Sequence, residues 1–370
     1  DYLGTKLAIG DVNGDGKDDL IMGTGNSRGD IFVVYNDTYK VLISTANNLK
    51  YIRDSNNYNV NFNKSPHDNF GARCVRVGDI NGDGKGDLLM GAELYDYSGR
   101  TDSGVLYVVL STAMPTGTGN NLDIDSNYSV RYVGSAANEG LGYDGVVADV
   151  NGDGSKDLII STELGDYSGR TNCGAVYVID SSKIQTSGTV DLNDSNNYSQ
   201  KFVGASGSDC LGRCIEAGDV NGDGYNDLIM GAYWADTRSR TNNGAVYIVY
   251  STLLADLPEG IVDLSNTNNF SIRYDGSANN ETISYSYGYG FAFGDLNADG
   301  KEDFVFGSGA DAGDAGATEY TYVIFSDTIS PSAITNLSAL TGAAQGQIKL
   351  TWTAPGDDGT LYNNIEGSYY

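Results

Sequence analysis

The sequence is poor in basic residues, in proline and in long apolar runs. Lys and Arg number 22 against 49 Asp and Glu, which gives a formal charge of −27. Nucleic acids and anionic membrane surfaces are therefore disfavoured partners, because both are bound through an excess of Lys and Arg. No apolar run approaches the roughly 18 residues that a membrane helix needs, so no membrane insertion is expected.

Cysteine and histidine are scarce as well. Four cysteines are too few for a disulfide scaffold and lack the C-x-x-C spacing of a zinc site. The single histidine, His67, stands in a connecting stretch with no nucleophile or metal-ligand pattern around it. No nucleophile elbow, phosphate-binding glycine loop or H-E-x-x-H motif occurs. The sequence therefore predicts a protein that is not an enzyme.

Glycine, by contrast, is abundant. It supplies 50 of 370 residues, about twice the usual share of roughly 7%, whereas proline supplies only 5. A chain that turns on Gly, Asn and Asp rather than on Pro is typical of an all-β fold with many tight turns.

One nine-residue pattern, D-x-N-x-D-G-x-x-D, occurs five times. The copies, here called acidic loops one to five, are residues 11–19, 79–87, 149–157, 219–227 and 295–303. Their first aspartates are 68, 70, 70 and 76 residues apart. A pattern that returns at this period indicates a repeat architecture.

The spacing within an acidic loop suits a hard cation. Side chains at positions 1, 3 and 5 converge when the backbone coils, and Gly at position 6 permits the sharp turn. A backbone carbonyl at position 7 and the Asp at position 9 complete an all-oxygen shell, which favours Ca²⁺ over Zn²⁺ and over Mg²⁺. The alternative is an Asx-rich turn without metal, in which the clustered carboxylates would repel one another. We expect about five structural Ca²⁺ ions, which would bring the formal charge from −27 to −17.

The predicted ligands occupy positions 1, 3, 5, 7 and 9 of each loop. They are Asp11, Asn13, Asp15, Lys17 and Asp19; Asp79, Asn81, Asp83, Lys85 and Asp87; Asp149, Asn151, Asp153, Ser155 and Asp157; Asp219, Asn221, Asp223, Tyr225 and Asp227; and Asp295, Asn297, Asp299, Lys301 and Asp303.

An EF-hand opens in the same way but needs an acidic ligand at position 12 and a helix afterwards. Position 12 is apolar in every copy here, and a short apolar run that ends at Gly follows, as in Leu88-Leu89-Met90-Gly91. That pattern indicates a buried strand. Each repeat of about 70 residues reads as four antiparallel strands, with the acidic loop between the first and the second. The expected fold is an all-β propeller of four-stranded blades.

The pairs Phe70-Gly71 with Gly91-Ala92, and Leu211-Gly212 with Gly231-Ala232, resemble the FG-GAP repeat of integrin α-subunit propellers. The resemblance covers roughly residues 3–328. It implies that the calcium loops lie on one face, opposite the loops that contact partners. Integrin propellers have seven blades, whereas five acidic loops are visible here, so the expected number is at least five, with seven open for a full chain.

The fifth repeat supplies strands one to three, the third at 320–325, and Pro331 follows. We expect the missing outer strand to come from residues before Asp1 or from a neighbouring molecule, because an open edge invites pairing. The propeller is therefore assigned to residues 1–328. Residues 329–370 resemble the first strands of a fibronectin type III module, with Trp352 in its core, and form a partial β-sandwich in this prediction. A propeller followed by such a module is similar to the arrangement of bacterial surface proteins.

Three arginines recur 70 residues apart, each beside an aromatic residue. The set, a candidate for partner binding, is Tyr97, Arg100, Tyr167, Arg170, Trp234 and Arg240. Arg and aromatic residues often anchor interfaces. The alternative, which the repetition favours, is that each Arg holds its loop to the neighbouring blade through Asp96, Asp166 or Asp236.

Cys173 and Cys210 fall in loops on the same predicted face of adjacent blades, so a disulfide between them is plausible in an exported protein. Cys74 and Cys214 are expected to be buried thiols near the axis.

These features predict an extracellular propeller that acts in adhesion or as a surface or filament scaffold. It would contact a protein partner, or further copies of itself, through the face opposite calcium. Two alternatives remain open, a glycan-binding propeller and a non-catalytic appendage of a secreted hydrolase.

Overall fold

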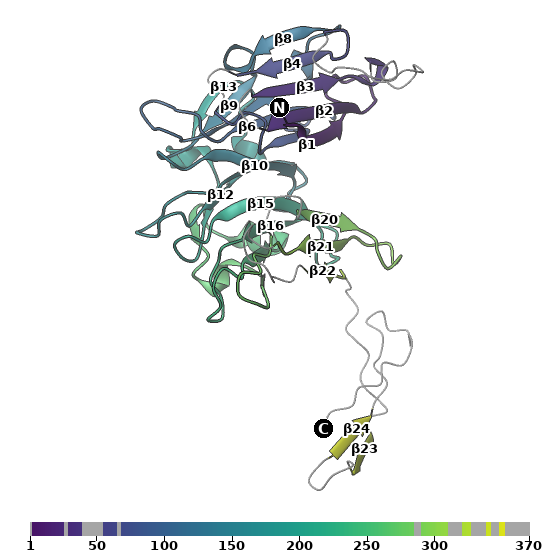
Figure 1. Cartoon of the computed structure of the whole chain (residues 1–370), viewed down its shortest axis with the longest axis vertical. Coiled ribbons are helices and arrows are strands. Elements are labelled where there is room, and N and C mark those ends of the chain that lie inside the picture. Colours follow the sequence, from purple (N-terminus) through teal and green to yellow (C-terminus); the bar gives the residue numbers. More distant parts are fainter. Residues whose placement is uncertain are drawn as a thin grey trace.

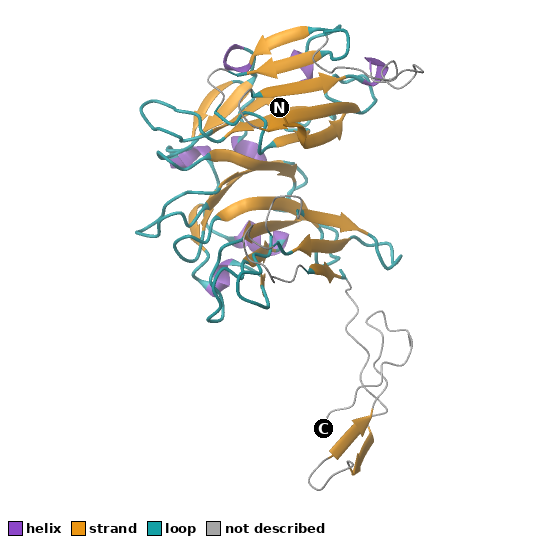
Figure 2. Cartoon of the chain, viewed as in Figure 1, coloured by secondary structure: helices purple, strands orange, loops and turns teal. Residues whose placement is uncertain are grey.

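The computed structural model describes residues 2–25, 29–38, 55–64, 68–284, 290–309, 320–326, 338–341 and 348–351. Within them the chain forms a succession of β-sheets joined by loops and short helical turns (Figures 1 and 2). The predicted all-β class is confirmed. The helical segments that punctuate the connections are η1 (Ser111–Ala113), η2 (Ile124–Ser126), η3 (Ser181–Lys183), η4 (Ser195–Asn197), α2 (Ser251–Asp256) and η5 (Thr267–Asn269).

The sheets follow one another in chain order. Sheet one contains β1 (Tyr2–Gly10), β2 (Asp19–Gly25), β3 (Asp30–Val34), β4 (Val60–Asn63) and β8 (Asn120–Asp123). Sheet two contains β5 (Val75–Gly78), β6 (Asp87–Ala92), β7 (Val105–Val109), β9 (Val130–Val133) and β13 (Gly188–Asp191). Sheet three contains β10 (Leu141–Ala148), β11 (Asp157–Thr162), β12 (Ala175–Ile179), β14 (Gln200–Val203) and β18 (Gly260–Asp263). Sheet four contains β15 (Leu211–Gly218), β16 (Asp227–Ala232), β17 (Ala245–Val249) and β19 (Ile272–Asp275), and sheet five contains β20 (Phe291–Gly294), β21 (Asp303–Gly307) and β22 (Thr321–Ile324).

The first three sheets have a fifth strand that the sequence did not predict. The connection between the third and fourth strands of each following repeat crosses back and pairs in parallel with the outermost strand of the sheet before it. In this way β8 joins β4, β13 joins β9 and β18 joins β14. These sheets therefore keep the four predicted antiparallel strands and add a fifth, parallel strand that the repeat pattern did not reveal. A polar connection such as 188–191 pairs here because the outer edge of the neighbouring sheet offers free backbone groups.

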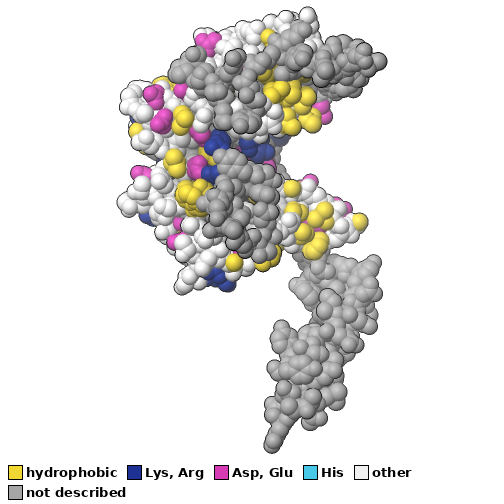
Figure 3. Space-filling view, in the orientation of Figure 1, with side chains coloured by type: hydrophobic (Ala, Val, Ile, Leu, Met, Phe, Trp, Pro, Cys, Tyr) yellow, Lys and Arg dark blue, Asp and Glu magenta, His cyan; other side chains and the backbone are white. Residues whose placement is uncertain are grey.

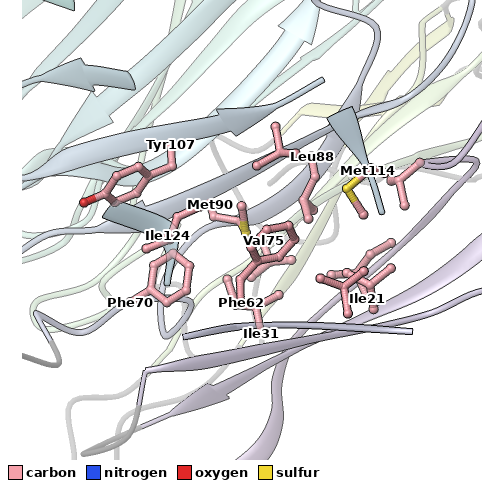
Figure 4. Packing of buried hydrophobic residues seen from close by; sticks show 14 of the residues in the cluster. Ile21, Ile31, Phe62, Phe70, Val75, Leu88, Met90, Tyr107, Met114 and Ile124 are labelled. Carbon is pink, nitrogen blue, oxygen red and sulfur yellow. The ribbon is translucent and has the colours of Figure 1, made fainter. Parts of the chain in front are cut away.

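The core lies between successive sheets, and each central strand contributes to two layers of it. Leu88 and Met90 of β6 pack in the layer between sheets one and two, as Figure 4 shows, whereas Leu89 packs toward sheet three. Side chains alternate across a strand, so a strand covered on both faces needs apolar residues at every position. This explains why β6 is buried throughout.

The innermost strands β1, β5, β10, β15 and β20 contact one another in that order. Residues from all five strands, or directly beside them, line one central cavity. Sheets that pack face to face, each with its innermost strand beside a common central axis, are the blades of a β-propeller. In Figure 1 the first blade lies at the top and the blade of β20–β22 at the lower right.

Two glycines allow neighbouring blades to approach closely. Gly71 donates its N–H to the carbonyl of Gly91 in β6 at 2.9 Å, and a β-carbon placed on Gly71 would lie 2.5 Å from the side chain of Ile31 in the first blade. A β-carbon placed on Gly91 would lie 1.9 Å from the carbonyl oxygen of Gly142 in the next blade. Only glycine fits at position 91. This close approach explains physically why the sequence carries glycine in both parts of the FG-GAP motif, Phe70-Gly71 and Gly91-Ala92.

The prediction for residues 329–370 is only partly covered by the described residues. Strands β23 (Ser338–Thr341) and β24 (Ile348–Thr351) pair antiparallel, as two consecutive strands of a sandwich would. The fibronectin-like assignment itself and the closing strand of the ring stay predictions. His67 and Trp352 lie outside the described residues.

Candidate metal centres

Each acidic loop connects the first and second strands of its blade and is coiled by its own side chains. In loop two the Asp79 carboxylate accepts hydrogen bonds from the backbone N–H groups of Asp83 at 3.1 Å and Gly84 at 2.8 Å. Asn81 accepts from Asp83 N–H at 2.9 Å, and Asp83 accepts from Lys85 N–H at 2.9 Å. The same four bonds recur in the other loops. The predicted ligands at positions 1, 3 and 5 therefore converge on one turn.

The aspartate at position 9 has a further task that the sequence did not reveal. One oxygen of Asp87 accepts the Ile80 N–H at 3.0 Å, and the other accepts the Ser111 N–H, just after β7, at 2.8 Å. The equivalent residues Asp19, Asp157, Asp227 and Asp303 make the same two kinds of bond. Position 9 thus fastens the start of its loop to the end of the third strand. All five of these residues are buried.

Loop three brings a carboxylate from outside the loop into the site. Asp180, which follows β12, has an oxygen within 4.8 Å of oxygens of Asp153 and Asp157. The Asn151 amide reaches all three carboxylates, most closely Asp180 Oδ2 at 2.8 Å. The other four loops have an apolar or aromatic residue at the matching position, so the pattern D-x-N-x-D-G-x-x-D could not indicate this ligand.

The electrostatics of the loops fit a bound cation. Burial raises the pKa of Asp157 to about 7, and the nearby carboxylates of Asp180 and Asp153 add to the effect. Burial likewise raises the pKa of Asp19 to about 6 and of Asp227 to about 7. Carboxylates crowded in this way favour a positive charge among them, and an oxygen-only donor set suits Ca²⁺. The residues present therefore fit calcium, and the chemistry it would supply is charge neutralisation and cross-linking of the turn.

The repeats were compared with known proteins. Residues 3–43, 75–109, 141–179 and 215–249 match the family model of the FG-GAP repeat. The chain contains FG-GAP repeats. Together with the stacked blades, they make it an integrin α-like β-propeller, as the resemblance implied.

Curated relatives of the chain include integrin alpha subunits and phosphatidylinositol-glycan-specific phospholipases D. Integrin alpha pat-2 of Caenorhabditis briggsae is 28% identical over 265 residues, which cover 67% of this chain and 19% of the integrin. Phosphatidylinositol-glycan-specific phospholipase D is 26% identical in Dictyostelium discoideum, over 56% of this chain and 23% of that enzyme, and 30% identical in Bos taurus, over 47% and 20%. The chain thus spans about a fifth of the length of these relatives.

A solved structure described as the Dos1 propeller aligns with this chain at 11% identity and a TM-score of 0.34. The alignment covers 94% of this chain and 67% of the Dos1 chain. No helix in the described part of the chain is long and apolar enough to cross a membrane.

The repeated arginines lie at the end of the blades opposite the acidic loops, because the loop between the second and third strands leaves an antiparallel sheet at the other end. Arg170 binds the carboxylate of Asp263 at 2.9 and 2.6 Å and the Ala205 carbonyl at 2.9 Å. Arg100 binds Asp191 at 2.7 Å. Both acids end the parallel fifth strands that are contributed by the next blade.

The acids expected to hold these arginines have a different role. Asp96, Asp166 and Asp236 each accept a backbone N–H within their own loop. The guanidinium groups of Arg100 and Arg170 also lie 5.2 Å from the rings of Tyr97 and Tyr167. Arg240 makes a weaker contact, to the Gly276 carbonyl at 3.4 Å. Trp234 is partly exposed, with Tyr233 packed beside it at 5.0 Å between ring centroids.

All four cysteines are free, buried thiols in the structure, so the expected disulfide between Cys173 and Cys210 is not formed. Cys173 instead donates its S–H to the Gly165 carbonyl at 3.3 Å. Burial raises the pKa of Cys210 to about 12, which keeps the thiol protonated and unreactive.

A buried acidic residue precedes three first strands in the same register, a signal the sequence analysis missed. Glu139 and Asp209 stand two residues before the apolar residue of a Leu-Gly pair, Glu281 stands two residues before Ile283, and all three acids are nearly inaccessible. Tyr177 donates its hydroxyl to Glu139 at 2.6 Å, and Tyr322 donates to Glu281. These bonds join the third strand of one blade to the connection that enters it.

Proposed function

We propose that this chain is a calcium-stabilised propeller that works outside the cell, in adhesion or as a surface scaffold, through protein–protein contacts and without catalysis. The observation that carries the proposal is the acidic loop, repeated five times with one internal geometry and with a carboxylate cluster in loop three. Extracellular modules of this kind suit sites with dissociation constants of about 10⁻⁴ to 10⁻³ M, because calcium outside cells is millimolar.

Calcium's role in this proposal is mechanical. Positions 1, 3 and 5 of each loop hold the ion, and position 9 transmits the constraint to the third strand through its two backbone hydrogen bonds. The loaded loops would keep the inner two strands of each blade in register. The opposite end of the blades would then present a fixed surface to a partner.

For the repeated arginines, a structural role was favoured over partner binding from the repetition alone. Arg100 and Arg170 are engaged within the protein, so they serve chiefly to position the blades. Trp234 is the member of that set that is partly exposed beside a second aromatic ring, which suits an interface anchor. A Trp234→Ala variant in surface plasmon resonance should lose binding to immobilised partner candidates while its calcium-dependent melting is unchanged.

Self-assembly and glycan binding make different predictions for the same protein. Sedimentation at high concentration with calcium should show oligomers if copies associate, and a strict monomer would exclude assembly. Binding on a glycan array would favour the lectin alternative. Retention of a protein partner together with a silent array would favour adhesion.

A second candidate is a non-catalytic appendage of a hydrolase. The matches to phosphatidylinositol-glycan-specific phospholipase D favour it, since they cover about a fifth of that enzyme. Assaying this chain alone for phospholipase D activity tests the absence of catalysis that the adhesion proposal and the appendage proposal share. We expect no turnover, and calcium-dependent turnover above the blank would contradict the non-enzymatic role.

A further inference from the structure

A cavity of about 440 Å³ opens where the innermost strands meet. Its charged lining consists of Lys6 from β1, Arg73 and Arg76 at β5, Asp144 from β10, and Arg213 and Glu216 from β15. Four basic side chains meet two acidic ones in a protein of formal charge −27. Figure 3 shows Lys and Arg gathered near the middle of the molecule, between the upper and lower blades.

The two acids of the lining are already used. Arg76 donates Nε to Asp144 Oδ1 at 3.2 Å and Nη2 to Oδ2 at 3.1 Å, and it donates Nη1 to Glu216 at 3.2 Å. Asp144 also accepts the Gly145 N–H at 2.9 Å. This network joins blades two, three and four at the axis, and the attraction of Asp144 raises the pKa of Arg76.

The remaining basic groups are positioned by acids that do not line the cavity. Arg73 is 3.4 Å from Glu93, and Arg213 is paired with Glu163. Lys6 makes no ion pair with any described residue. Lys6, Arg73 and Arg213 thus all border the cavity, while the acids that pair with the two arginines lie outside its lining.

A buried hydroxyl supplies an independent observation. Tyr143 lines the cavity and is only 4% exposed, and its OH has no hydrogen-bond partner among the described residues. The guanidinium groups of Arg73 and Arg213 lie 5.2 and 5.6 Å from its ring. A buried donor without an acceptor costs about 1–3 kcal/mol, so the site lacks one acceptor.

We propose that the central cavity binds the oxyanion group of a small molecule, which accepts hydrogen bonds from Lys6, Arg73, Arg213 and Tyr143. A guanidinium fork matches the two oxygens of a carboxylate, sulfate or phosphate. The volume falls within the roughly 300–1,000 Å³ of small-molecule sites. The negative charge elsewhere on the protein acts weakly here, because charges beyond about 8 Å are screened at physiological salt.

The test is isothermal titration of the 370-residue chain with succinate and with sulfate in saturating calcium, against chloride at equal ionic strength. We expect one of the two anions to bind at a single site. Succinate alone would identify a carboxylate ligand, and sulfate alone a tetrahedral oxyanion. Lys6→Gln and Tyr143→Phe should each weaken binding by about tenfold or more.

Arg238→Gln is the matched control, because it removes the same charge as Lys6→Gln but lies outside the cavity lining. It should bind the anion like the wild type. Tyr143→Phe removes only a hydroxyl that has no partner among the described residues, so its melting temperature should equal or exceed that of the wild type and unfolding cannot explain a loss of binding. No heat with either anion, or wild-type affinity in both Lys6→Gln and Tyr143→Phe, would overturn the proposal and leave the calcium role untouched.

Discussion

Arg170 donates hydrogen bonds to both carboxylate oxygens of Asp263, 93 residues further along the chain, at 2.9 and 2.6 Å. The acid ends β18, the strand that one repeat contributes to the outer edge of the preceding blade. The pair therefore closes a contact between blades at the end of the molecule opposite the acidic loops.

Removing this pair should cost about 1 kcal/mol of coupling energy, since both side chains are only partly exposed and the geometry is bidentate. A double-mutant cycle with Arg170→Met and Asp263→Asn, followed by urea unfolding, measures it. Arg240→Met is the control, because the only hydrogen bond of the Arg240 side chain to a described residue is a 3.4 Å contact with a carbonyl. Equal losses in Arg170→Met and Arg240→Met would contradict the assignment.

Gly91→Ala should destabilise the protein by about 3 kcal/mol, because the added methyl group meets the Gly142 carbonyl oxygen of the next blade. Gly294→Ala is a matched control in a β-strand, where nothing lies within 4 Å of the new carbon. In thermal melts, the melting temperature of Gly91→Ala should lie clearly below that of Gly294→Ala. A Gly91→Ala melt within a degree of the control would show that the blades do not approach as described.

Asp209 should make stability depend on pH. Burial raises its pKa to about 6, so its charged form disfavours the folded state. The sign follows: the unfavourable contribution is fully present above pH 6 and is lost as the pH falls below 3.8, the ordinary pKa of Asp, where the carboxyl is protonated in both states.

Asp209→Asn should therefore gain on the order of 2 kcal/mol relative to wild type at pH 7, and this gain should shrink below pH 6 and vanish below about pH 3.8. Urea unfolding at several pH values checks it. Asp256→Asn, an exposed acid at the end of α2, should show a difference that does not vary with pH. A constant difference for Asp209→Asn as well would refute the raised pKa.

Removal of calcium should lower the melting temperature by many degrees, because ions that bind only the folded state stabilise it by mass action. Melting in EDTA, then with calcium or magnesium restored, measures the effect. Recovery with calcium but not with an equal concentration of magnesium is expected. An unchanged melt in EDTA would eliminate calcium as a structural ion.

Asp180→Asn should weaken calcium binding at loop three alone, by roughly tenfold, since the charge of one ligand is lost. The substitution retains the oxygen that caps η3, where Asp180 accepts from Ser182 N–H. Asp194→Asn is a close control, because Asp194 caps η4 through the same kind of bond to Asn196 N–H. Calcium stoichiometry by native mass spectrometry separates the loops. Full occupancy at low calcium in both variants would exclude Asp180 as a ligand.

Local features were predictable because they depend on residues close in the chain. The acidic loops, the strand 87–92 and the all-β class follow from turn chemistry and apolar runs. Only part of the role of the position 9 aspartate could be predicted from the sequence. Its place in the loop suggested a ligand, whereas its bond to the end of the third strand required the register of β6 with β7.

The partner of each repeated arginine could not be predicted. Asp96 and Asp166 were the nearby choices in sequence, yet Asp191 and Asp263 lie beside Arg100 and Arg170 because a connecting segment crosses to the neighbouring blade. Whether Cys173 and Cys210 form a disulfide likewise depends on the orientation of their side chains, which the sequence does not give. Cys173 directs its thiol to the Gly165 carbonyl.

Glycine spacing and clustered aspartates alone dictated the repeat, its turns and the kind of ion that suits them, since these are properties of short stretches of backbone. Folding in three dimensions decided which edges accept a fifth strand, which acid meets which base, and that basic side chains gather at the axis. Those outcomes depend on contacts between residues far apart in the chain, and no local pattern encodes such distances.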